Sequence, residues 1–146
     1  GWWGHNKTTR FNPPKLFEPI PSVEAWQLSN PPILSMAALR SSLDLFNQTG
    51  INTLIEKSKT LTGYLEYLIL SLDSKKISII TPIESNERGS QLSLQINFNE
   101  SDIKKIFEAA NIICDFRKPN VIRVAPCAFY NSYMDVYNFV DALKKL

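Results

Sequence analysis

The sequence has little of what builds metal sites and disulfide scaffolds. Its 146 residues include two cysteines, Cys114 and Cys127, and one histidine, His5. Two cysteines are too few for a disulfide framework, and they do not form a Cys-x-x-Cys pair of the kind that holds structural zinc. A single histidine excludes a histidine-rich metal centre. We therefore predict no metal site.

The common catalytic motifs are absent too. The chain contains no Gly-x-Ser-x-Gly, P-loop, Gly-x-Gly-x-x-Gly or His-Glu-x-x-His motif. A Ser-His-Asp triad or a Cys–His pair would have to use His5, and no feature singles out such an arrangement. The interpretation we favour is that His5 is a loop histidine with an ordinary partner. Cys114 is then a small, buried apolar residue in a strand.

No charge of one sign dominates, and no long apolar run is present. Lys and Arg number 16 and Asp and Glu 14, a net charge of +2, which argues against a nucleic-acid-binding or membrane-surface protein. The apolar stretches are far shorter than the roughly 20 residues of a membrane span. The first residues have neither the basic start nor the apolar run of a signal peptide. We expect a cytoplasmic protein, and the missing initiator methionine is consistent with a chain that begins inside a larger protein.

What the sequence does contain is typical of a globular domain. Hydrophobic residues make up 44% and charged residues 21%, and the length suits one domain of about 150 residues. Residues 1–32 hold most of the nine prolines and predict irregular structure, apart from a short strand over residues 23–28. Asn30, followed by two prolines, predicts the N-cap of a helix over about residues 31–48, which Gly50 ends.

The rest of the chain predicts a mixed fold. Apolar spacings of three and four indicate a second helix over residues 51–69, and alternation indicates strands from residue 77 on. The order of elements is ααββαββα, which predicts an α+β fold with a mostly antiparallel sheet covered by helices on one side. The later elements are strands at 77–81 and 92–98, a helix capped by Asn99 or Ser101, strands at 112–116 and 121–125 around a turn at 118–120, and a helix with a Ser132–Asp135 capping box.

Two features near the start of the chain could bind an anion. An indole donates one hydrogen bond and accepts none, so Trp2 or Trp3 could bind a phosphate or carboxylate at its edge and stack on a ring with its face. The two prolines after Asn30 remove amides that a helix start offers an anion, so a phosphate there would have to use the Asn30 side chain. The alternatives are that the tryptophans only pack against the domain or a partner subunit and that Asn30 is only the N-cap of the helix. The residues alone favour these alternatives.

The third feature is Arg123. Alternation places it on the strand face opposite Ile122 and Val124. A guanidinium holds a carboxylate in a two-pronged fork, which suits an amino-acid substrate. The alternative is a solvated strand face with a surface ion pair, and the residues leave both open.

Two blocks, Trp-Trp-Gly-His at residues 2–5 and Ser-Asn-Pro-Pro at residues 29–32, together with further segments in order along nearly the whole chain, resemble the C-terminal part of kynureninase. These two blocks are the specific ones. Further matching segments are residues 9–11, 28–34, 61–69, 80–82, 87–92, 114–115, 122–126, 130–132 and 135–137.

The resemblance implies the small C-terminal domain of an aminotransferase-like enzyme that uses pyridoxal 5'-phosphate (PLP). Residues 1–32 would end the large PLP domain and link it to the small domain, residues 33–146. Kynureninases hydrolyse kynurenine or 3-hydroxykynurenine to an anthranilate and alanine, in tryptophan catabolism and NAD biosynthesis. They are homodimers with the active site at the subunit interface.

The resemblance also assigns roles to residues of this chain. Trp2 and Asn30 match positions that reach PLP near its phosphate from the neighbouring subunit, and Arg123 matches the arginine that binds the substrate's α-carboxylate. Trp3, Ser29 and Asn30 match positions around the substrate's aromatic ring. A phenylalanine is common at the position of Trp3, and an asparagine at position 30 resembles animal-type enzymes that prefer the 3-hydroxy substrate.

No catalytic residue is expected within these 146 residues. PLP chemistry needs a lysine for the Schiff base and a carboxylate for the pyridinium nitrogen. The family carries both upstream of the Trp-Gly-His block, and no lysine here matches that position. We therefore expect this segment to be inactive alone. Two alternatives stay open: another PLP enzyme of the superfamily, such as a desulfurase or transaminase, and a non-catalytic α+β interaction domain with a tryptophan-rich interface.

Overall fold

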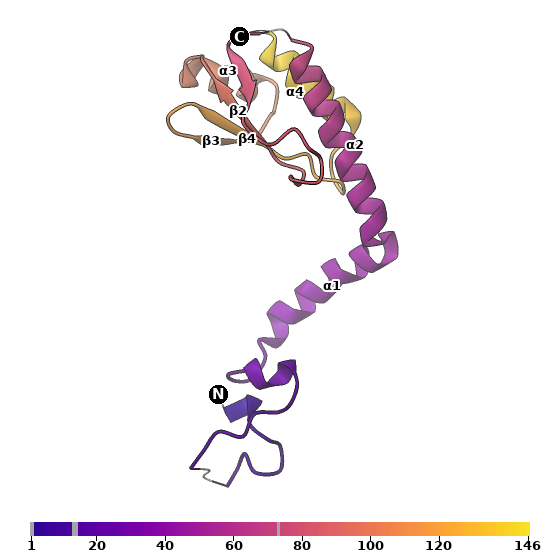
Figure 1. Cartoon of the computed structure of the whole chain (residues 1–146), viewed down its shortest axis with the longest axis vertical. Helices are drawn as coiled ribbons and strands as arrows, with labels where there is room; N and C mark the ends of the chain where they lie inside the picture. Colours follow the sequence, from indigo (N-terminus) through magenta and orange to yellow (C-terminus); the bar gives the residue numbers. More distant parts are fainter. Residues whose placement is uncertain (1, 13–14, 73) are drawn as a thin grey trace. The chain divides into compact units, whose positions relative to one another are not determined.

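The chain is described by a computed structural model that covers residues 2–12, 15–72 and 74–146 (Figure 1). Two compact units are present, Gly1–Gln48 and Thr49–Leu146, and each is described by itself. The domain boundary predicted between residues 32 and 33 concerns a larger enzyme and stays a prediction. None of the helices formed by the described residues has the length and apolar character that a membrane crossing requires.

Two short 3-10 helices pack together in the first unit. Helix η1 spans Trp2–Gly4 and helix η2 spans Val23–Trp26. A β-carbon on Gly4 would lie 2.2 Å from the carbonyl oxygen of Ala25, so the close approach of the two helices requires glycine. The amide of Ile20 adds a hydrogen bond of 2.9 Å to the carbonyl of Gly4.

The strand predicted over residues 23–28 is wrong. The Ser22 hydroxyl accepts a hydrogen bond from the Glu24 amide at 3.2 Å, and the Ala25 amide donates to the Ser22 carbonyl at 3.1 Å. These local hydrogen bonds stabilise the turn of η2 in place of an extended chain. The apolar alternation of this segment therefore does not correspond to a sheet.

Helix α1 spans Ile33–Thr49, so the prediction that Asn30 is its N-cap is wrong. A residue that precedes proline avoids helical backbone angles, and both Asn30 and Pro31 precede a proline. The first turn instead starts at Pro32, whose carbonyl accepts from the amide of Met36 at 3.0 Å. Gly50 ends the helix as predicted, with a φ of 81°.

No residue of α1 is buried within this chain. The face of the helix that carries Leu34, Ala38, Ser41 and Leu45 is exposed like the rest of it. Periodic apolar spacing thus identified the helix correctly, and no described residue of the first unit covers its apolar side chains.

The second unit has the predicted order of helices and strands. Helix α2, Ile51–Leu70, is followed by an antiparallel sheet with the strand order β1-β2-β4-β3. The strands are shorter than predicted, and β3 begins later. Their bounds are Ile77–Ile79 for β1, Leu92–Ile96 for β2, Asp115–Arg117 for β3 and Val121–Val124 for β4, with helices α3 at Glu100–Ala109 and α4 at Tyr133–Leu143.

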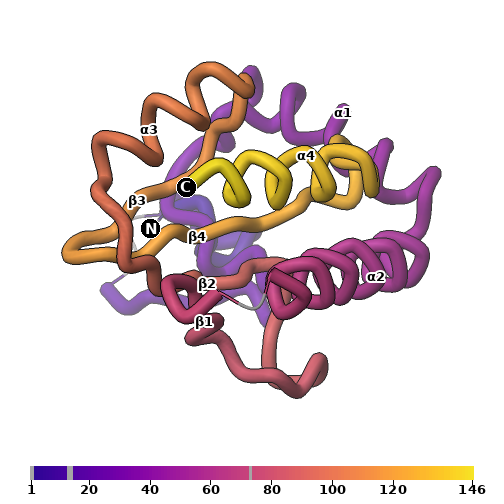
Figure 2. Tube along the Cα trace, turned by 90° about the horizontal axis from the view of Figure 1, so that it is seen from above, coloured from indigo at the N-terminus to yellow at the C-terminus, as the bar shows by residue number. Residues whose placement is uncertain are grey.

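The core lies between one face of this sheet and the three helices of the unit. Helices α2 and α4 run side by side (Figures 1 and 2), and α3 reaches the same core, where the rings of Phe107 and Phe139 are 5.5 Å apart. The apolar stripe of α4, formed by Val136, Phe139, Val140 and Leu143, is buried throughout. The core residues are Leu61, Leu65, Ile69, Leu92, Leu94, Ile96, Ile103, Phe107, Ile122, Val136, Phe139, Val140, Ala142 and Leu143.

Side chains cap both later helices as predicted. Asn99, rather than Ser101, is the N-cap of α3, and its carbonyl oxygen accepts from the Ser101 amide at 3.2 Å. Ser132 and Asp135 form a full capping box at α4: the Asp135 amide donates to the Ser132 hydroxyl, and the Ser132 amide donates to the Asp135 carboxylate. These caps explain why α3 and α4 begin where they do.

Candidate functional site

Strand pairing places Arg123 in a row of polar residues across the sheet. On β4, Arg123 pairs with Ser93 of β2 on one side and with Asp115 of β3 on the other. Its sequence neighbour Ile122 points into the core and is fully buried, so the row lies on the opposite, outer face. The side chain of Arg123 is 37% exposed.

Asp115 is shared by two arginines. Arg123 donates to its Oδ2 atom from Nε at 2.7 Å and also from Nη2, and Arg117 donates to the same oxygen from Nε at 2.9 Å. The hydrogen bond from Arg123 is the largest cause that lowers the pKa of the Asp115 carboxyl below its ordinary value, and Arg117 adds to it. Two positive charges and one negative charge leave the group with a net charge of +1.

Arg123 also borders a pocket of about 430 Å³ in the second unit. Apolar walls from Leu65 and Phe139 meet polar groups of Asn131 and Asn138 there. Such a mixture of apolar walls and a few polar groups is typical of small-molecule sites.

The other titratable groups of this pocket are not poised for chemistry. Burial, with a smaller effect of the neighbouring Asp115 charge, raises the pKa of the Cys114 thiol to about 11, so it stays protonated near neutral pH. Asp135 is used by the capping box, and its hydrogen bonds from Ser132 lower the pKa of its carboxyl. Cys114 packs against the core just before β3, close to the role predicted for it. Within the described residues no cluster of His, Cys, Asp and Glu could hold a metal ion.

In the first unit, Trp2 and Trp3 form a fixed aromatic block. Their rings meet edge to face with centroids 5.0 Å apart. The guanidinium of Arg10 lies 5.9 Å from the Trp2 ring centroid and 5.1 Å from that of Trp3. It also donates to the carbonyls of Trp3 at 2.8 Å and His5 at 3.0 Å. Trp2 nevertheless remains 46% exposed.

His5 has the structural role that the sequence favoured. It is 3% exposed, and its Nδ1 accepts from the Glu18 amide at 3.1 Å. Its Nε2 lies 3.1 Å from the Thr9 hydroxyl, which donates to the Glu18 carboxylate at 2.9 Å. Both ring nitrogens are therefore engaged, while both cysteines belong to the other unit.

Ser29 and Asn30 lie in the segment that leads into α1. Both are exposed, and the Ser29 carbonyl accepts from the side chain of Gln27 at 3.0 Å. The first unit thus contains Trp2, Trp3, Ser29 and Asn30, and the second contains Arg123.

A family model decides the classification. Residues 54–143 match the model of the kynureninase C-terminal domain. The chain belongs to the kynureninase family. Similar proteins include kynureninases of Myxococcus xanthus, 51% identical over 144 residues, and of Xanthomonas oryzae pv. oryzae, 46% identical over 147 residues. Each alignment covers 99% of this chain but only 34% and 35% of the relative, so the chain spans about a third of the length of these kynureninases.

Solved structures confirm the aminotransferase-like fold. A NifS-like protein from Rickettsia africae matches with a TM-score of 0.64, over 80% of this chain and 35% of the other. An alanine–glyoxylate aminotransferase from Nostoc sp. matches with a TM-score of 0.62, over 85% of this chain and 34% of the other. Both are 18% identical to this chain, so they show the fold alone. The family and the α+β small-domain fold predicted from sequence are both confirmed.

Two residues with specific contacts were not identified as candidates from sequence. Arg10 stands only within a matching segment, residues 9–11, and its position beside the two indole rings has no sequence signal. The contact of Asp115 with Arg123 does have a sequence signal. A hairpin that turns at residues 118–120 pairs residue 117 with 121 and therefore residue 115 with 123.

Proposed function

We propose that this chain is the C-terminal part of a PLP-dependent kynureninase. The full-length protein would hydrolyse kynurenine or 3-hydroxykynurenine to anthranilate or 3-hydroxyanthranilate and alanine, in tryptophan catabolism. The family match supports this reaction class. The observation that carries the substrate assignment is Arg123, a partly exposed arginine on strand β4 at the border of a pocket.

Arg123 would bind the α-carboxylate of the substrate. Asp115 occupies the Nε and Nη2 atoms of Arg123 from one side, which leaves Nη1 for another acceptor. A carboxylate bound there would orient the amino acid, because a guanidinium fixes both the position and the plane of the group it binds. Trp3, Ser29 and Asn30 would contact the aromatic ring of the substrate.

The residues proposed to hold PLP suit its phosphate. Trp2 is a partly exposed residue whose indole has one N–H donor, and Asn30 is an exposed residue before the helix whose side-chain amide can also donate. Both groups can donate a hydrogen bond, which an anionic phosphate accepts. PLP, when bound, withdraws electrons from the α-carbon of the substrate. In this proposal Trp2 and Asn30 hold the cofactor, and Arg123 holds the substrate against it.

The assembly belongs to the proposal as well. The full-length protein would be a cytoplasmic homodimer in which Trp2 and Asn30 serve the active site of the neighbouring subunit. The exposed apolar residues of α1 support a covered position for this helix in the whole protein, since such a surface is costly to leave in water. The segment alone would be inactive, because none of its lysines matches the Schiff-base position.

Borohydride reduction of the full-length protein tests this function. The expected result is one PLP-modified lysine upstream of residue 1, found by peptide mass spectrometry, together with turnover of kynurenine. A native protein of 16.6 kDa without PLP would contradict the proposal and favour a non-catalytic interaction domain. PLP on the predicted lysine without kynurenine turnover would favour another enzyme of the superfamily.

A further inference from the structure

Asp115 binds Arg123 in a way that leaves part of the guanidinium free. Both hydrogen bonds from Arg123 reach one oxygen, Oδ2, and both come from the Nε and Nη2 side. The planar guanidinium has a second side, toward Nη1, that these contacts do not use. Asp115 thus holds the arginine without blocking it.

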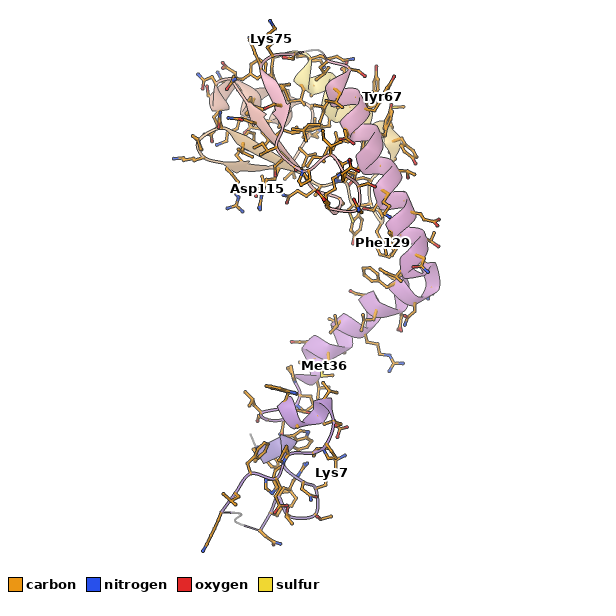
Figure 3. The ribbon with its side chains drawn as sticks, in the orientation of Figure 1. Lys7, Met36, Tyr67, Lys75, Asp115 and Phe129 are labelled. Carbon is orange, nitrogen blue, oxygen red and sulfur yellow. The ribbon has the colours of Figure 1, made fainter. Side chains whose placement is uncertain are left out.

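The backbone makes this contact firm. Asp115 and Arg123 are direct partners in the antiparallel β3–β4 pair, which places their β-carbons about 5 Å apart. The hairpin that joins the two strands is short, and β2 pairs with β4 on its other side. Figure 3 shows Asp115 at the side of the sheet away from α2. The carboxylate therefore meets the arginine from a fixed direction.

Arg117 compensates the charge that Asp115 brings. A lone carboxylate beside Arg123 would repel an anionic substrate. Arg117 donates to the same Oδ2 atom at 2.9 Å, from the same strand as Asp115. The trio keeps a net positive charge, so it can still attract a carboxylate.

We propose that Asp115 is a positioning residue for Arg123, which orients the guanidinium so that its Nη1 side receives the carboxylate of the amino-acid substrate. This inference rests on the proposed function, in which Arg123 binds that carboxylate. It adds that the affinity for the carboxylate depends on a residue that does not touch the substrate.

Two probes that differ only in the carboxylate test the proposal in the full-length protein. Kynurenine carries the α-carboxylate, and kynuramine is the same molecule without it. We expect Asp115→Ala to raise the KM of kynurenine by roughly tenfold, the loss of about one charge-assisted hydrogen bond, with a small change in kcat. The inhibition constant of kynuramine should stay unchanged, which also shows that the variant is folded. Asp115→Asn, which keeps an oxygen acceptor at the same length, should recover part of the loss.

Asp141→Ala is the matched control. Asp141 is 43% exposed, against 44% for Asp115, and pairs only with Lys145 at 3.4 Å among the ion pairs of the described residues. This variant should leave both constants unchanged. Crystal structures of the wild-type protein and of Asp115→Ala give a readout independent of activity, because the orientation of the Arg123 guanidinium should differ between the two.

The outcomes separate the two proposals. One outcome is that Arg123→Ala weakens the binding of kynurenine but not of kynuramine, while Asp115→Ala leaves the KM of kynurenine unchanged or lowers it. In that case the positioning role of Asp115 is wrong and the proposed function of Arg123 stands. An unchanged Arg123 orientation in the Asp115→Ala crystal would likewise overturn the positioning role. If Arg123→Ala affects both probes equally or neither, the carboxylate assignment itself is wrong.

Discussion

The Arg88 guanidinium binds the Glu66 carboxylate through both of its terminal nitrogens. Nη1 donates to Oε1 at 3.0 Å and Nη2 donates to Oε2 at 2.5 Å, and Nη1 also reaches the carbonyl of Pro82 at 3.2 Å. The two side chains are only 6% and 16% exposed. This pair therefore connects the C-terminal half of α2 to the loop between β1 and β2.

Breaking this pair should destabilise the second unit. Glu66→Gln leaves Arg88 nearly buried without its counter-ion, and such a loss costs roughly 3 kcal/mol, the low end of the range for a buried ion pair. Urea unfolding followed by circular dichroism measures the change. Asp141→Asn removes an exposed carboxylate with one lysine partner and should cost less than about 1 kcal/mol. Equal effects of the two variants would contradict a special role for the Glu66–Arg88 pair.

The same pair predicts a dependence of stability on pH. The hydrogen bond from Arg88 is the main cause that lowers the pKa of Glu66 from its ordinary value of 4.5. Because the folded pKa lies below the unfolded one, the stabilisation is complete above the unfolded pKa and is lost as the pH falls through the folded pKa. The difference in unfolding free energy between wild type and Glu66→Gln should be constant from pH 6 to 8 and shrink below about pH 4.5. A difference that grows on acidification would mean that folding raises the pKa of Glu66 and does not lower it.

How well the sequence predicted the structure depended on where the deciding contacts lie. The α4 stripe and its capping box involve residues close in sequence, so period and spacing sufficed. The Glu66–Arg88 pair had no sequence signal, because Arg88 is far along the chain from Glu66 and spacing carries no information on such a pairing. The segment at residues 23–28 failed for a different reason, since the hydrogen bonds around Ser22 outweigh its alternation.

The candidate site shows the same limit. The alternation of β4 correctly placed Arg123 opposite the buried Ile122, and the family resemblance supplied its expected role. The shared Asp115 followed only from pairing the two strands. The position of Arg10 beside the rings of Trp2 and Trp3 depends on the path of an irregular, proline-rich segment, which no period describes.

Gly4 provides a test of the first unit with a matched glycine in the second. A methyl group on Gly4 would collide with the backbone of Ala25, so Gly4→Ala should separate η1 from η2 and cost about 1–3 kcal/mol or more. Gly63→Ala, in α2, meets no atom within 4 Å and should stabilise that helix by about 0.5–1 kcal/mol. Limited proteolysis should cleave residues 1–30 faster in Gly4→Ala alone. Equal protection of this segment in both variants would mean that η1 and η2 do not depend on their close approach.

Arg123 gives the most direct test of the proposed substrate. A charge-assisted hydrogen bond contributes about 1.5–3 kcal/mol, so Arg123→Ala should lower the kcat/KM of the full-length protein for kynurenine by roughly 10- to 150-fold. Arg123→Lys keeps the charge but loses the fork that binds a carboxylate through two donors, and it should recover only part of this loss. Steady-state kinetics with both variants measures the difference. Full recovery by lysine would mean that Arg123 acts through its charge alone, and an unchanged kcat/KM in Arg123→Ala would remove it from the site.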